Sequence, residues 1–240
     1  MKWKTYHSKS AEELYLYKFL SKLDFKKFLE TGAIWFSRAD IFGDKMECVR
    51  INDLIEDKPN YENIKARKRK FLISCWHLAN RESLVLWDTY SDTIDKRRTI
   101  AIRFKRTELV SLLEYYAIRN HGNFRYTTIF VHGKVVYKQL INVDNEMLLE
   151  RAVKYPAFRK ELAFKYENEY RLLIQLDGEH SENGYGYSLK PAKDLPFKII
   201  INPLLSSEVY LPLKEEIENL GFGDKLIESD LNKWLHPELW

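Results

Sequence analysis

The segment F-K-Y-E-N-E-Y-R-L-L-I-Q-L at residues 164–176 places charged side chains at the start of an apolar strand. Because side chains alternate across a β-strand, a strand that begins at Glu169 sets Glu169 and Arg171 on one face and Tyr170 and Leu172 on the other. The second face belongs to a core. Two interpretations of the first face stay open: a solvated outer surface with a glutamate–arginine pair, or the polar wall of a ligand cleft.

Short apolar segments of both periodicities are mixed along the 240 residues, without a steady strand–helix–strand rhythm. This pattern predicts a single α+β domain over residues 1–240, with a mixed or antiparallel sheet flanked by helices. Strands are expected at 14–21, 33–42, 71–78, 98–105 and 169–176, with two within 184–203 and one at 225–231. Residues 127–139 are expected to form a strand or a hairpin around Gly133. Helices are expected at 24–32, 52–70, 82–92, 107–117, 144–166 and 206–221.

Helix ends carry recognisable signals. Asp24 can cap the first helix, and Gly32 suits the left-handed position after its last turn. Asp44 and Glu47 have the spacing of a capping box, in which the first side chain caps a helix and the second bonds back to it. We therefore expect a structural role for this pair.

No run approaches the roughly 20 apolar residues of a membrane span, and the N-terminus lacks the apolar region of a signal peptide. Cys48 and Cys75 are the only cysteines, so there is neither a disulfide framework nor a zinc ligand set. We expect a cytoplasmic protein without membrane contact or bound metal.

One dense basic run occurs within I-K-A-R-K-R-K, in a chain whose net charge is only +4. It contains Lys65, Arg67, Lys68, Arg69 and Lys70. Two interpretations stay open: the solvated end of a helix, or a patch that contacts nucleic-acid phosphates.

Phosphate-binding, dinucleotide-binding, serine-hydrolase and zinc-protease motifs are all missing. Four segments in order nevertheless resemble an uncharacterised, mostly bacterial family known as domain of unknown function 2971. They are L-Y-K-F-L-S, A-I-W-F-S-R-A-D-I-F-G-D-K-M-E-C-V, I-S-C-W-H with L-W-D-T-Y-S-D, and F-K-Y-E-N-E-Y-R-L-L-I. The resemblance spans about residues 14 to 205.

The order of a polar first strand, a helix ending in glycine, a second strand ending in serine and a late strand opening with glutamate also resembles the ADP-ribosyltransferase layout. That resemblance implies NAD as substrate and Glu169 as the catalytic carboxylate, with Glu167 as the first glutamate of an E-x-E pair. Arg171 beside Glu169 is the third expected catalytic residue, because its guanidinium would lower the Glu169 pKa and keep that carboxylate ionised. A negative charge there lowers the barrier to an oxocarbenium ion. The implied cofactor-binding residues are Tyr17, Lys18, Trp35, Ser37 and Trp76.

Three hypotheses of function stay open. The first is an ADP-ribosyltransferase-like enzyme, acting as a bacterial antiphage-defence or toxin effector on a nucleic acid or a partner protein. The second is a non-catalytic nucleotide or nucleic-acid binding module that uses the basic run with Arg97, Arg98 and Arg103, while Trp76 and Trp87 either stack on bases or belong to the core. The third is a metal-dependent phosphodiesterase with Asp44, Glu47, Glu167 and Glu169 around Mg²⁺.

Overall fold

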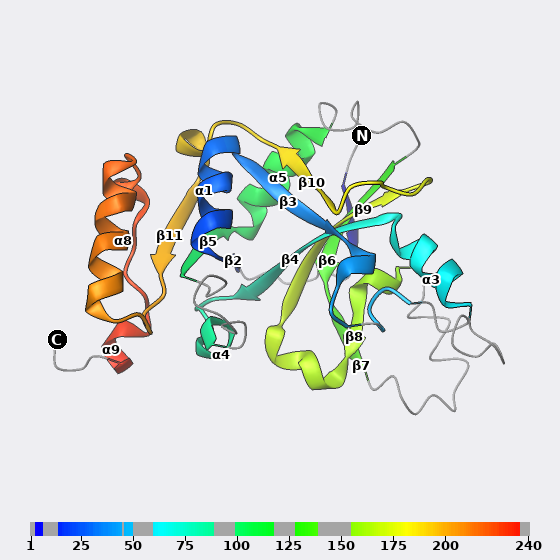
Figure 1. Ribbon diagram of the computed structural model, residues 1–240, viewed down its shortest axis with the longest axis horizontal. Coiled ribbons are helices and arrows are strands. Elements are labelled where there is room, and N and C mark those ends of the chain that lie inside the picture. Colours follow the sequence, from blue (N-terminus) through cyan, green and yellow to red (C-terminus); the bar gives the residue numbers. More distant parts are fainter. Residues whose placement is uncertain are drawn as a thin grey trace. The chain divides into compact units, whose positions relative to one another are not determined.

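The computed structural model describes residues 3–6, 14–44, 46–49, 60–88, 99–117, 128–138 and 155–235. It has mixed α+β structure, with a mostly antiparallel sheet flanked by helices, which confirms the predicted fold class (Figure 1). The chain groups into two compact units. Unit 1 comprises residues 1–10, 34–76 and 112–188, and unit 2 comprises residues 11–33, 77–111 and 189–240. A single domain over residues 1–240 stays a prediction.

Unit 1 holds most of the strands. These are β1 (Lys4–Tyr6), β3 (Ala33–Arg38), β4 (Phe71–Ala79), β6 (Thr128–Lys134), β7 (Val136–Lys138), β8 (Arg159–Glu161), β9 (Glu169–Leu176) and β10 (Gly184–Ser188). Its helical segments are α3 (Tyr61–Lys68) and the short 3-10 turns η1 (Ala39–Ile41), η3 (Pro156–Phe158) and η4 (Leu162–Glu167). Strand β3 starts one residue before the unit, and the last three residues of β4 belong to unit 2.

Strand pairing in unit 1 puts β9 between β6 and β4, with β6 antiparallel to β9 and β1 parallel to β6. Strand β3 pairs with β10 and runs antiparallel to β4, where Ser37 lies opposite Ile73. Strands β7 and β8 form a separate parallel pair in which Tyr137 lies opposite Lys160. The η4 turn and Asn168 connect β8 to β9, and Lys160 of β8 contacts Glu169 of β9.

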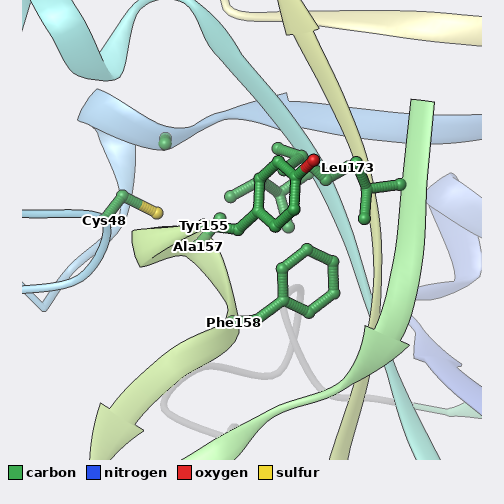
Figure 2. Close-up of a cluster of buried hydrophobic side chains, with 8 residues drawn as sticks. Cys48, Tyr155, Ala157, Phe158 and Leu173 are labelled. Carbon is green, nitrogen blue, oxygen red and sulfur yellow. The ribbon is translucent and has the colours of Figure 1, made fainter. Parts of the chain in front are cut away.

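One face of the unit 1 sheet is covered by a hydrophobic cluster. Leu173 of β9 and Ile73 of β4 pack there with Cys48, Tyr155, Ala157, Phe158, Val131 and Ala39. Figure 2 shows the rings of Tyr155 and Phe158 beside Leu173, with Cys48 approaching from a separate segment. Because Leu173 is two and four residues from Arg171 and Glu169 on β9, these three side chains share this face.

Strand β9 is buried on both faces, since Glu169, Arg171 and Leu173 on one face and Tyr170, Leu172 and Ile174 on the other are all buried. The interpretation of the Glu169 face as a solvated outer surface is therefore wrong. The alternation itself is as predicted, but both faces of a central strand are covered.

Unit 2 holds β2 (Tyr15–Leu20) between the end of β4 and β5 (Ile100–Lys105), and β11 (Phe197–Ile201) next to β5, all antiparallel. Its helices are α1 (Lys22–Thr31), α4 (Leu84–Asp88), α8 (Ser207–Asn219) and α9 (Asn232–Leu235), with 3-10 turns η5 (Ala192–Asp194) and η6 (Gly223–Lys225). Helix α5 (Arg106–Tyr115) begins in unit 2 and ends in unit 1. Ion pairs of Lys22 and Lys26 with Glu216 join α1 to α8.

Helix α1 begins earlier than predicted. Its N-cap is Ser21, whose hydroxyl accepts a hydrogen bond from the Asp24 backbone N–H at 3.1 Å and donates to the Asp24 carboxylate at 2.7 Å. Asp24 is therefore the third helical residue, whose backbone N–H is capped by Ser21, rather than the cap itself. Gly32 ends the helix with φ of 60°, as predicted, and an added Cβ would lie 2.1 Å from the Lys190 carbonyl oxygen.

Three further expectations differ from the structure. Residues 155–166 form two 3-10 turns and β8 rather than a helix, and the remainder of the expected 144–166 helix lies outside the described residues. Residues 225–231 contain one isolated bridge, from Leu226 to Ile199, instead of a strand. Helix α3 covers only 61–68 of the expected 52–70, and residues 52–59 are likewise outside the described part. No helix in the described ranges combines the length and apolar character needed to cross a membrane.

Candidate functional site

Five charged side chains of unit 1 form one buried ion network. Arg171 Nη2 lies 2.5 Å from Glu47 Oε1, and Arg171 Nε lies 2.6 Å from Glu169 Oε2. Lys160 Nζ lies 2.9 Å from Glu169 Oε1 and 3.2 Å from Glu47 Oε1, and it also pairs with Glu167 Oε2. None of the five side chains is more than 8% exposed. The structure thus brings together the predicted Glu167, Glu169 and Arg171.

Arg171 is the most buried member, with a side chain that is 0% exposed. Its third hydrogen-bonding nitrogen, Nη1, donates to the Ala157 carbonyl oxygen at 2.7 Å. A guanidinium can be buried only when its donors are satisfied, because the desolvation cost is otherwise uncompensated. Arg171 therefore organises the carboxylates around it and has little surface left for a ligand.

Local backbone geometry explains how the carboxylates converge. Glu169 is the first residue of β9, while Glu167 ends the η4 turn. Asn168 between them adopts a left-handed conformation with φ of 41°, a region that asparagine tolerates better than most residues. This reversal turns both glutamates toward Lys160.

The pKa values of the two neighbouring glutamates Glu167 and Glu169 are shifted in opposite directions. Burial opposes the charge of Glu169, but the Arg171 guanidinium, hydrogen bonds from Glu167 and Arg171, and the Lys160 ammonium hold the Glu169 pKa well below its usual range. Burial, with the hydrogen bond and negative charge of Glu169, raises the pKa of Glu167 to about 7, although Lys160 opposes this shift. Three carboxyl groups and two cations are neutral together when Glu167 holds a proton. Near pH 7 the network therefore gains or loses a proton at Glu167.

Lys160 occupies the position that a divalent cation would need. Its ammonium contacts Glu47, Glu167 and Glu169, three of the four carboxylates in the phosphodiesterase hypothesis. Burial opposes the charge of Lys160, but the surrounding carboxylates raise its pKa above the usual value, so it stays charged. Within the described ranges, no group of three or more His, Cys, Asp or Glu side chains is arranged to hold a metal ion. The geometry does not favour the phosphodiesterase hypothesis.

Glu47 does not complete a capping box. Its backbone N–H contacts the Asp44 carbonyl oxygen in a turn, while its carboxylate enters the ion network. The Asp44 side chain accepts a hydrogen bond from the Met46 N–H at 2.8 Å, and residues 46–48 form a turn rather than a helix. The capping-box prediction is therefore wrong, because the buried cations are stronger partners for Glu47 than a backbone amide.

Two site residues escaped the sequence analysis. Lys160 fell within a segment that was expected to be helical, and Tyr137 fell within the segment expected to form a strand or a hairpin. The Tyr137 hydroxyl accepts a hydrogen bond of 2.7 Å from the backbone N–H of Glu169. The only local signal for Lys160 is a lysine inside R-K-E-L-A-F, a pattern equally typical of a surface.

Register places the predicted residues of β3 on the same face as the network. Ser37 lies opposite Ile73, and directly opposed residues of antiparallel strands point to the same side. Ile73 packs with Leu173, which shares its face of β9 with Glu169. Trp35, two residues before Ser37, follows the same alternation, and its side chain is 52% exposed.

Trp76 points to the opposite face of the sheet, because it is three residues from Ile73 on β4. It is buried, and its indole N–H donates to the Ser74 hydroxyl at 3.1 Å. Trp87 is also buried, and its indole N–H donates to Glu82 at 2.8 Å. The interpretation of both tryptophans as core residues is confirmed, and Trp76 does not join the candidate site.

The first-strand pair, Tyr17 and Lys18, belongs to unit 2 and occupies opposite faces of β2. Tyr17 is buried in a hydrophobic cluster with Phe19, and its hydroxyl donates to the Asn80 carbonyl oxygen at 3.3 Å. A contact of either residue with a nucleotide stays a prediction. For Tyr17 the observed environment is that of a core residue.

The basic run does not form one continuous cationic surface. Lys68 is buried, and Arg69 pairs with Glu179 at 3.1 Å and with Asp40 at 3.5 Å. The Cζ atom of Arg103 lies 4.4 Å from the centroid of the Tyr15 ring. Arg97 and Arg98 are outside the described residues. These contacts give the binding-module hypothesis no specific support.

No family model matches this chain, and neither a curated protein nor a solved structure matches it.

Proposed function

We propose that the protein is an ADP-ribosyltransferase-like enzyme that cleaves NAD, with the Glu167–Glu169 pair as its catalytic carboxyls. The observation that carries the proposal is the opposite shift of two neighbouring carboxyl groups. Glu169 has a pKa held well below its usual range, while that of Glu167 is raised to about 7. Pairs of carboxyls whose environments drive their pKa values apart are typical of acid–base catalysis.

Each carboxyl fits one step of the reaction. Cleavage breaks the bond between the ribose C1′ and the nicotinamide nitrogen, and its electron pair leaves with neutral nicotinamide. The ionised Glu169 would accept a hydrogen bond from the ribose 2′-hydroxyl, as the resemblance implies, and stabilise the positive charge that develops on the ribose. Glu167 would then take the proton of the attacking acceptor, a role suited to a base with a pKa near 7.

Glu169 retains acceptor capacity for a ligand. Its two oxygens accept hydrogen bonds from Lys160 Nζ and Arg171 Nε, and the protonated Glu167 carboxyl is a third donor to this carboxylate. A carboxylate can accept about four hydrogen bonds, so one acceptor position is left for a ligand. The exposed Trp35 and the half-buried Ser37 lie on the same face of the sheet and are the proposed nicotinamide contacts.

The test compares the wild type with Glu169→Gln and Glu167→Gln, with Glu179→Gln as a matched control on the surface. Labelled NAD is supplied with candidate target protein, DNA and RNA, and both nicotinamide release and label transfer are followed. We expect turnover by the wild type and by Glu179→Gln, and loss of turnover with retained NAD binding in Glu169→Gln. A wild type that neither binds NAD in calorimetry nor releases nicotinamide contradicts the proposal.

Glu169→Gln will not be neutral for stability, contrary to what isosteric replacement alone suggests. Both Glu169 oxygens face cationic donors, so a glutamine NH₂ group would meet either Lys160 or Arg171. We expect a lower melting temperature, and kinetics must be recorded below the unfolding transition of the variant. Retained NAD binding under those conditions shows that the site is intact.

A further inference from the structure

The main chain of Glu169 is held on both sides at the start of β9. Its carbonyl oxygen accepts a hydrogen bond of 2.9 Å from the Val135 N–H, and its own N–H donates to the Tyr137 hydroxyl at 2.7 Å. Tyr137 lies opposite Lys160 in the β7–β8 pair, and Lys160 bonds the Glu169 carboxylate. Tyr137 and Lys160 therefore reach Glu169 from adjacent strands.

The hydroxyl hydrogen of Tyr137 takes no part in the hydrogen bond with Glu169. A phenol can accept and donate at once, and in the bond to Glu169 the tyrosine oxygen is the acceptor. In the part of the chain that the structure describes, no group accepts the hydroxyl hydrogen. Burial raises the pKa of Tyr137, so this hydrogen is retained at neutral pH. The side chain is only half-buried, which leaves it accessible.

We propose that Tyr137 is a further substrate-contacting residue, whose hydroxyl donates a hydrogen bond to a sugar oxygen of the nucleotide held at Glu169. This inference rests on the proposed function and deepens it. If Glu169 accepts from the 2′-hydroxyl of the nicotinamide ribose, the neighbouring 3′-oxygen is the acceptor that this donor would serve. Tyr137 would then donate a hydrogen bond to the 3′-oxygen, and Glu169 would accept one from the 2′-hydroxyl of the same ribose. The two contacts together would distinguish ribose from deoxyribose substrates.

The test is a two-by-two comparison of wild type and Tyr137→Phe, each with NAD and with the NAD analogue that lacks the 3′-hydroxyl of the nicotinamide ribose. We expect the wild type to lose about tenfold in kcat/KM with the analogue, the effect of one neutral hydrogen bond. Tyr137→Phe should lose about tenfold with NAD and show no further loss with the analogue. A residue that acts only by supporting the fold would leave the discrimination between the two substrates unchanged.

Tyr187→Phe is the matched control, since the Tyr187 hydroxyl donates to the Leu113 carbonyl oxygen at 2.7 Å. It should lose stability and keep the tenfold discrimination. If Tyr137→Phe fails to fold, the wild type alone still decides, because equal kcat/KM with NAD and the analogue overturns the inference. Unchanged kcat/KM or undiminished discrimination in Tyr137→Phe overturns the inference and leaves the proposed function standing. A wild type without NAD turnover overturns both.

Discussion

Glu47 and Arg171 are 124 residues apart in the sequence, and their side chains meet at 2.5 Å inside unit 1. The pair fastens the 46–49 turn to the central strand β9, next to the hydrophobic cluster that contains Cys48 and Leu173. Its charges are removed from water, so each depends on the other for compensation. The ion network of the candidate site therefore also stabilises the fold of unit 1.

We predict that Glu47→Ala destabilises the protein by about 3–5 kcal/mol, because it leaves part of the buried positive charge of Arg171 uncompensated. The matched control is Glu179→Ala, which removes a surface ion pair with Arg69 and should cost about 0–1 kcal/mol. Chemical denaturation of both variants measures the difference. Equal small losses would show that the Glu47 pair contributes no more than a surface pair.

The sequence predicted those features of the site that depend on local periodicity. Alternation along β9 placed Glu169 and Arg171 on one face. Fold class followed from the mixture of short strands and helices. These patterns are set by neighbours in the chain, so they can be read without knowing the fold.

Partners distant in the chain could not be predicted in the same way. Glu47 has the spacing of a capping residue, and only the folded structure brings Arg171 and Lys160 near enough to compete for it. The burial of the Glu169 face depends on the cluster with Tyr155 and Phe158, which a strand pattern does not specify (Figure 2). Lys160 was missed because a buried and an exposed lysine look alike in sequence.

Ser21 and Ser206 both occupy N-cap positions, but only the Ser21 hydroxyl accepts a hydrogen bond from the first turn of its helix. We predict that Ser21→Ala costs about 1 kcal/mol, since it leaves the Asp24 N–H without its cap. Ser206→Ala should change the free energy of unfolding by only about a few tenths of a kcal/mol, because its side chain makes no capping hydrogen bond. Thermal unfolding of both variants makes the comparison, and equal costs would argue against a stabilising N-cap at Ser21.

Gly184 packs directly under the ring of Trp35. An added Cβ would lie 2.4 Å from Trp35 Cζ2 and 2.5 Å from the Phe36 carbonyl oxygen, so Gly184→Ala must displace β10 or the tryptophan. We expect a loss of about 1–3 kcal/mol and an altered Trp35 environment in fluorescence. Gly43→Ala is the control, because nothing lies within 4 Å of its added Cβ. An unperturbed Gly184→Ala would place Trp35 elsewhere.

The proton held by Glu167 predicts the pH dependence of ADP-ribose transfer to the acceptor. A general base must be ionised, and the pKa of Glu167 is raised to about 7 by burial and by the neighbouring Glu169. We therefore expect kcat to rise about tenfold per pH unit below pH 7 and to level off above it. Glu169, whose pKa is held low, stays ionised throughout this range and adds no second change in kcat with pH.

Stopped assays at pH values from about 5.5 to about 8.5 measure how kcat depends on pH. Glu167→Gln should remove the rise, while Glu179→Gln should keep it; a pH-independent wild type would exclude Glu167 as the base.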